Sequence, residues 1–294
     1  MKNLIFIIVF HLSVIQAWSQ TLIDSIYTST HGIIQKELTF YEVEGYNVFV
    51  FQYNFSFNQD NINKIKKQYQ IKSNGMSIKD PFLKKGKLFV DTQMKTKSIF
   101  QSDIYYLFPS NENSISIIGF QTFLIRDIDF EHAFAKAILK NTIPKSSYSE
   151  TKLDSINFVG RTLIFDFNCN WKRPHNVQCP FLGQMNWALF RNENRSKEFL
   201  NKQYELTADK SIGEIVQNDT VDILFEKNKT KALKVTFKLH MPNSDKNKDN
   251  TLIIYYVSCL VRGKYIACVL SHYSDEVDEN ELPPLINEVM QLSF

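Results

Sequence analysis

The feature that most constrains this chain is the stretch from Thr251 to Tyr273, where two apolar runs meet at Arg262-Gly263-Lys264. Two such runs joined by a short glycine-containing segment predict a β-hairpin. If Gly263 and Lys264 form the turn, Cys259 lies opposite Cys268. A turn at Arg262-Gly263 instead shifts the register and separates the two cysteines. We expect the first register, because Gly263 then occupies the position that favours a positive φ.

Both faces of this hairpin are apolar. One face carries Ile253, Tyr255, Val257, Cys259, Val261, Ile266, Cys268, Leu270 and His272, and the other carries Leu252, Ile254, Tyr256, Leu260, Ala267, Val269 and Tyr273. A strand with one face in water alternates apolar and polar residues, so this pattern predicts a hairpin covered on both sides. We therefore expect helices, or a helix and a second layer, above and below it.

Length and composition predict a globular chain of two domains. The sequence has 294 residues, and domains usually hold roughly 100–200. The polar, turn-rich segment 142–155 is the expected linker between a first domain at 20–141 and a second at 156–294. The formal net charge of +3 is too small to indicate a nucleic-acid partner.

The first 19 residues predict a signal peptide. Lys2 precedes an apolar run from Leu4 to Val14, and Ala17-Trp18-Ser19 places small residues at the −3 and −1 positions of a cleavage site. The run is shorter than the ~20 residues that a membrane-spanning helix needs. We therefore expect an exported, soluble protein, periplasmic or extracellular, whose mature chain begins near Gln20.

Each half of the chain predicts the same order of elements: strands, a helix, several antiparallel strands and a closing helix. In the second half the closing helix is expected around Leu285–Leu292. The element order of the second half resembles the α/β/α sandwich of PsbP-like proteins. The resemblance rests on no motif and therefore implies no functional residues. The expected fold is α+β, with two similar domains of antiparallel sheet flanked by helices and an internal duplication.

All four cysteines lie in the second half of the chain. An even count in an exported protein predicts disulfides, and we expect the local pairs Cys169–Cys179 and Cys259–Cys268. A zinc site is the alternative, but the spacing lacks a CxxC pair and a nearby histidine.

The segment Cys169–Cys179 is the expected functional loop. A bridge between its ends would tie down a loop that carries Trp171, Lys172, Arg173, His175 and Asn176. An aromatic ring beside two cations and an imidazole is suited to grip a ligand or a partner protein. The plainer alternative is that Trp171 fills the edge of the domain while the charged residues face water.

No familiar catalytic signature is present: the chain has no GxSxG elbow, P-loop, GxGxxG, HExxH or EF-hand loop. His272 lies on an apolar strand, where a buried imidazole bonded to the Tyr255 hydroxyl is the expected arrangement. The leading hypothesis is a non-catalytic binding module with an unknown protein or glycan partner and no cofactor or metal. A secreted hydrolase that uses His175 or His272 with an acid is one alternative, and an immunity or inhibitor protein is another.

Overall fold

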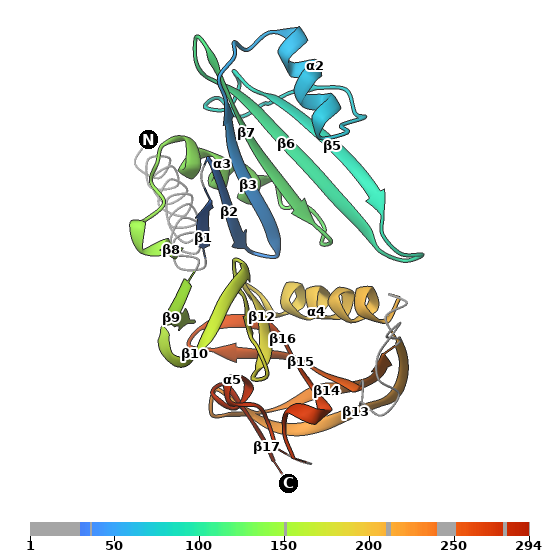
Figure 1. The fold of residues 1–294 in the computed structure, drawn as a ribbon. Helices are drawn as coiled ribbons and strands as arrows, with labels where there is room; N and C mark the ends of the chain where they lie inside the picture. The colour runs from blue at the N-terminus through green and yellow to red at the C-terminus, as the bar shows by residue number, and fades with distance from the viewer. Residues whose placement is uncertain are drawn as a thin grey trace, which may run out of the picture.

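The computed structural model describes residues 30–293 apart from 36, 150–151, 210–212, 240–250 and 279–280. Two large β-sheets dominate it, one from each half of the chain (Figure 1). The expectation of an α+β chain with two antiparallel sheets is confirmed at this level. The predicted signal peptide over residues 1–19 lies outside the described residues. Among the described helices, none is long and apolar enough to cross a membrane.

The first sheet has eight strands in the order β4-β5-β6-β7-β3-β2-β1-β8, and only the pair β1 and β8 is parallel. The strands are β1 (His31–Gln35), β2 (Leu38–Val43), β3 (Tyr46–Tyr53), β4 (Met76–Ser77), β5 (Lys87–Met94), β6 (Phe100–Asn111), β7 (Ser114–Thr122) and β8 (Tyr148–Ser149). The predicted linker 142–155 therefore contains β8, which joins this sheet, and the start of β9, which joins the second.

Two helices pack against opposite faces of the first sheet. Successive strand residues point to opposite faces, and alternate residues of β6 and β7 divide between two core clusters. α2 (Gln59–Gln68) buries Ile62 and Ile65 in one cluster, and the Asn58 side chain caps its first turn. α3 (Ile128–Leu139) buries Phe130 and Phe134 in the other.

The second sheet has nine strands, all antiparallel, in the order β17-β13-β14-β15-β16-β12-β11-β10-β9. The strands are β9 (Lys152–Phe158), β10 (Arg161–Arg173), β11 (Asn176–Cys179), β12 (Gly183–Phe190), β13 (Gly213–Phe225), β14 (Asn228–Leu239), β15 (Thr251–Val261), β16 (Lys264–Tyr273) and β17 (Met290–Leu292). The helical elements of this half are α4 (Glu193–Ala208) and α5 (Pro284–Asn287), and the short turns η1 (Lys145–Ser147) and η2 (Ser274–Glu276) precede β8 and follow β16.

The second sheet curls strongly around its core. Phe158 on the edge strand β9 contacts Phe225 on β13, seven strands away in the sheet, with ring centroids 6.2 Å apart. Arg161 and Arg262 both pair with Glu226 beside this contact, at 2.6 Å each. The expected closing helix at 285–292 is shorter than predicted: α5 is a single turn, and the chain then enters β17 beside β13.

Both halves use one connectivity. In the first half the strands before α2 and the strands after it form the two sides of the sheet, joined by the pair β3 and β7. In the second half the pair β12 and β16 joins the strands before and after α4 in the same way. The final short strand differs, since β8 lies beside β1 whereas β17 lies beside β13. Origin by duplication stays a prediction.

The hairpin β15–β16 forms, but in the alternative register. Arg262 and Gly263 make the turn with φ angles of 46° and 77°, the two positive values typical of a type I′ turn. Val261 therefore lies opposite Lys264, and Cys259 opposite Ile266. The predicted Cys259–Cys268 disulfide is wrong, and both thiols are free. A shift of two residues keeps each side chain on its expected face, and both faces are covered by core clusters.

The two halves meet along α4 and the β2–β3 turn, and Figure 1 shows α4 lying between the two sheets. Leu124 of the first half packs with Phe190 and Phe199 of the second. Glu44, in the β2–β3 turn, pairs with Arg191 at 3.2 Å, and Arg191 also pairs with Asp127 at 2.7 Å. These contacts fix the walls of the space between the sheets.

Candidate functional site

The predicted Cys169–Cys179 disulfide is present and closes the hairpin β10–β11. The two cysteines lie directly opposite each other, with Cα atoms 4.3 Å apart. Pro174 and His175 form the turn, where Pro fixes one φ and His175 adopts a φ of 56°. The loop expected from sequence is therefore a stapled two-stranded hairpin.

The tip of this hairpin inserts between the two sheets rather than projecting into solvent. Pro174 and His175 are buried, and Trp171 and Asn176 are half-buried. Only Lys172 and Arg173 are exposed. All of residues 171–176 except Pro174 belong to the functional loop predicted from sequence. Each of these six residues lines at least one of three cavities around the tip.

His175 joins His31, Trp171 and Trp187 in a cluster of rings. The ring centroids of His31 and His175 are 5.0 Å apart, those of His31 and Trp171 are 4.4 Å apart, and those of His175 and Trp187 are 5.0 Å apart. Ser149 Oγ lies 2.8 Å from Nε2 of His31, and the backbone N–H of His175 donates to its Nδ1 at 3.3 Å. A neutral His31 that carries its proton on Nε2 satisfies both contacts.

Burial keeps this imidazole pair uncharged. Desolvation lowers the pKa of His31 from 6.5 to about 4. Burial, and then the nearby His31, hold the pKa of His175 well below its usual value. Among the described residues, neither Nδ1 of His175 nor Nε1 of Trp171 has a hydrogen-bond partner. The cluster therefore joins the two halves through ring contacts more than through hydrogen bonds.

The predicted contact of His272 with a hydroxyl does not form. His272 is buried opposite Ile253, and its Nδ1 lies 2.9 Å from the carbonyl oxygen of Tyr273. Its ring stacks on Tyr255, with centroids 6.1 Å apart. The imidazole is buried as expected, but the backbone takes the place of the tyrosine hydroxyl.

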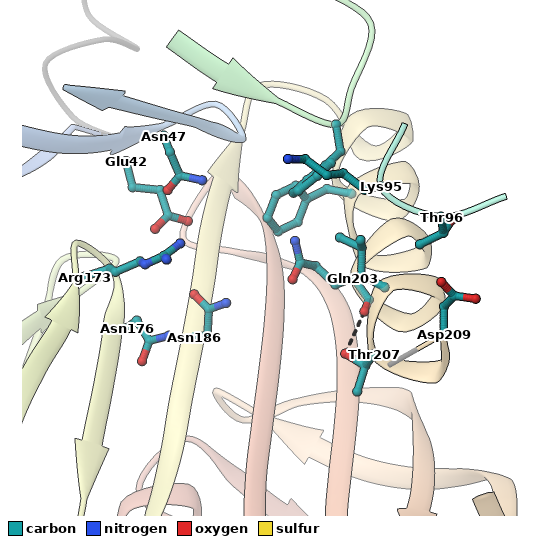
Figure 2. A pocket seen from close by; sticks show the side chains of 13 residues that line it. Glu42, Asn47, Lys95, Thr96, Arg173, Asn176, Asn186, Gln203, Thr207 and Asp209 are labelled. Carbon is teal, nitrogen blue, oxygen red and sulfur yellow. Dashed lines mark hydrogen bonds between the residues drawn. The ribbon is translucent and has the colours of Figure 1, made fainter. Parts of the chain in front are cut away.

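A polar cleft of about 540 Å³ opens on one side of the hairpin tip, between the two sheets. It is lined by residues of both halves: Glu42, Asn47, Lys95, Thr96, Phe123, Arg173, Asn176, Asn186, Phe199, Gln203, Leu206, Thr207 and Asp209. Figure 2 shows Glu42, Arg173, Asn176 and Asn186 along one wall and α4 with Gln203, Thr207 and Asp209 along the other. Arg173 and Asn176 are the members of the predicted loop that reach it.

Glu42 is the unusual group of this cleft. Its side chain is directed from β2 toward Arg173 (Figure 2), and the residue is 7% exposed. Among the described residues, no group donates a hydrogen bond to its carboxylate or forms an ion pair with it within 4.0 Å. Desolvation raises the pKa of Glu42 well above its usual value, and the charge of Arg173 opposes that shift only in part.

Three other glutamates with buried side chains are each neutralised by an arginine. Glu44 pairs with Arg191 at 3.2 Å, and Glu226 pairs with Arg161 at 2.6 Å. Glu131 accepts two hydrogen bonds from Arg126, at 2.9 and 2.6 Å, and further bonds from the hydroxyls of Tyr46 and Tyr106. A buried carboxylate is costly without such partners. Glu42 is therefore built differently from the structural glutamates of the same molecule.

Sequence reasoning missed Glu42, Asn186 and Gln203. The one available signal was Glu42 itself, a charged residue next to Tyr41 and Val43 in an expected strand. Asn186 and Gln203 gave no signal, because only the packing of the two halves brings β2, β12 and α4 together. Among the described residues, no group of three or more His, Cys, Asp or Glu side chains could hold a metal ion.

Comparisons with known proteins give no family for this chain. No protein-family model matches it, and no curated protein matches it. Among solved structures, DynU16 from the dynemicin biosynthetic locus aligns with 89% of this chain and 84% of its own, at 8% identity and a TM-score of 0.18. The di-domain ARO/CYC StfQ from the steffimycin pathway aligns with 76% of this chain and 83% of its own, at 5% identity and a TM-score of 0.16. TM-scores this low do not show a shared fold, and nothing about this chain follows from them.

Proposed function

We propose that this chain is an exported, non-catalytic binding protein whose small polar ligand occupies the cleft between the two sheets. The observation that carries the proposal is the carboxyl group of Glu42, a residue only 7% exposed, which faces the cleft across from Arg173 and forms no ion pair within 4.0 Å among the described residues. Buried polar groups normally have hydrogen-bond partners, and a bound ligand would supply them. The Cys169–Cys179 disulfide fits an oxidising compartment outside the cytoplasm.

The geometry of the cleft supports a ligand held by both halves. Its lining residues include members of β2 and β3 from the first half and of β10, β12 and α4 from the second. A volume of about 540 Å³ lies within the range of roughly 300–1,000 Å³ usual for small-molecule sites. The disulfide and the buried turn hold Arg173 and Asn176 in place before a ligand arrives, which lowers the entropy lost on binding.

The two alternatives to a binding protein gain no support from these contacts. A hydrolase that uses His175 or His272 needs an acid beside the imidazole, and among the described residues no carboxylate bonds to either ring. An inhibitor acting through the stapled loop needs that loop exposed, but Pro174 and His175 at its tip are buried.

The proposal is tested by a thermal-shift screen of the exported protein against a library of sugars, amino acids, organic acids and nucleotides. We expect one chemical class to raise the melting temperature of the wild-type protein. Arg173→Met should abolish that shift, because it removes the one guanidinium that the described residues place in the cleft lining. Lys197→Met, which removes an exposed cation on α4 outside the cleft, should leave the shift unchanged. A compound that stabilises all three proteins equally would contradict binding in this cleft.

A further inference from the structure

Among the described residues, the cleft lining carries both signs of charge. Glu42 and Asp209 supply two acidic groups, and Lys95 and Arg173 supply two cations. Figure 2 shows the two signs interspersed across the cleft rather than gathered on separate walls. A strongly anionic or cationic ligand would therefore gain little net attraction, because each of its charges would meet both signs. The arrangement favours an uncharged ligand with many polar groups.

Glu42 and Arg173 face each other across the cleft, and a hydroxyl group can bridge them. Arg173 is close enough to lower the pKa of Glu42, yet the described residues show no ion pair between them within 4.0 Å. A guanidinium only donates hydrogen bonds, and a carboxylate accepts them. A hydroxyl does both, so one placed in the gap can accept from Arg173 and donate to Glu42.

Three carboxamides of the cleft have the same double character. Asn47, Asn186 and Gln203 face the cleft with carboxamides, each of which presents both a donor and an acceptor. Among the described residues, none of these three carboxamides forms a side-chain hydrogen bond. Phe123 and Leu206 add apolar surface beside them, on which a C–H face can pack.

We infer that the ligand of this cleft is a neutral saccharide, of about one or two sugar units. This inference rests on the proposed binding function and specifies its ligand. Vicinal hydroxyls match the paired donors and acceptors of the carboxamides and of the Glu42–Arg173 gap. The ring C–H groups of a sugar match the apolar surface of Phe123 and Leu206. A uronic acid or an amino sugar of the same size would place its own charge among cleft residues of both signs.

The experiment is a glycan-array measurement with the intact disulfide-bonded protein. The array carries neutral mono- and disaccharides, each with its uronic-acid and amino-sugar counterpart. We expect binding to at least one neutral glycan, with both charged counterparts about tenfold weaker or more. Asn186→Leu and Arg173→Met should lower that affinity tenfold or more. Gln178→Leu, on the same hairpin but outside all three cavities, should not.

The possible outcomes separate this inference from the proposed function. Tighter binding of a charged counterpart, still lost in Arg173→Met, would overturn the neutral-saccharide assignment and leave the cleft as the binding site. Absence of binding to any glycan would also overturn the assignment, while the compound library still tests the cleft. Glycan binding that neither Asn186→Leu nor Arg173→Met weakens would overturn both the saccharide assignment and the cleft as the binding site. Circular dichroism and melting curves of each variant confirm that the affinities refer to folded protein.

Discussion

Two hairpins of the second sheet each carry two cysteines, and only one of them holds a disulfide. In β10–β11, Cys169 lies directly opposite Cys179 and the bond forms. In β15–β16, Cys259 lies opposite Ile266, two residues short of Cys268. Such diagonal neighbours are about 7–8 Å apart, beyond the usual Cα separation of a disulfide. Similar spacings in the sequence therefore produce opposite redox states.

The difference comes from the position of each turn and from a β-bulge in β10–β11. A two-residue turn at Pro174-His175 alone would place Cys179 opposite Asn170, one residue away from Cys169. The register shift between Trp171 and Arg173 leaves Lys172 unpaired and realigns the two cysteines. The hairpin β15–β16 has no such shift over its paired residues. Turn and bulge together, rather than cysteine spacing, decide which thiols can meet.

The largest expected effect follows removal of the Cys169–Cys179 disulfide. Replacing Cys169 and Cys179 together with alanine should lower the free energy of unfolding by about 2–5 kcal/mol, because the unfolded chain loses a constraint. Urea denaturation measures the change. Cys259→Ala is the matched control and should cost about 1 kcal/mol or less, since that thiol is half-buried and unbridged. Equal losses in the two variants would contradict the assignment of bridged and free cysteines.

The same hairpins show what sequence alone can predict. Apolar patterning identified the β15–β16 hairpin, its two faces and its coverage on both sides, because side-chain alternation survives a register shift of two residues. It did not identify the register, since Arg262 at a positive φ is unfavourable in isolation and is held here by bonds to Val159, Phe158 and Glu226.

The candidate site was predictable only in part for a related reason. The loop Cys169–Cys179 was identified from the local clustering of an aromatic ring, cations and an imidazole between two cysteines. The cleft needs Glu42, which is more than a hundred residues away in the chain, and α4 to lie beside that loop. No local pattern encodes such a meeting of two halves.

Acid should weaken the stapled hairpin through His31. The pKa of this residue in the folded protein is about 4, below the usual value of 6.5, so the folded state favours the neutral ring. The stabilisation is complete above pH 6.5 and is lost as the pH falls from 6.5 toward 4. The full effect amounts to roughly 3 kcal/mol at most. Unfolding free energies measured across this range should fall more steeply for wild type than for His31→Gln. Parallel profiles would contradict this role for His31.

A smaller and opposite effect is expected at Glu42. Burial raises the pKa of Glu42 in the folded state, so the folded protein favours the protonated acid. The stabilisation that this protonation gives is complete below about pH 4.5 and is lost as the pH rises through the folded pKa. Glu42→Gln should therefore stabilise the ligand-free protein by roughly 1–2 kcal/mol at pH 8 and by almost nothing at pH 4.5. Chemical denaturation at the two pH values measures this.

Glu131→Gln is the matched control for Glu42→Gln, because Glu131 is buried but accepts hydrogen bonds from Arg126, Tyr46 and Tyr106. Breaking that set should destabilise the protein at pH 8, since it leaves the Arg126 guanidinium with an incomplete partner. Stabilisation by Glu42→Gln together with destabilisation by Glu131→Gln at pH 8 would support a ligand-facing role for Glu42. A loss of stability in both would place Glu42 among the structural glutamates.

The smallest expected effect concerns the turn of the unbridged hairpin. Gly263 has a φ of 77°, and a Cβ added there meets nothing within 4 Å, so Gly263→Ala should cost only the conformational penalty of about 1 kcal/mol. Gly160→Ala should cost the same free energy of unfolding, because Gly160 has a φ of 86° and equally open surroundings. Gly45→Ala should cost more, because its Cβ would lie 2.9 Å from the Phe190 ring between the two halves. Urea denaturation of the three variants ranks these costs. A Gly45 variant no worse than the other two would mean that the β2–β3 turn does not pack tightly against the second half, and the wall that carries Glu42 would then lack its support.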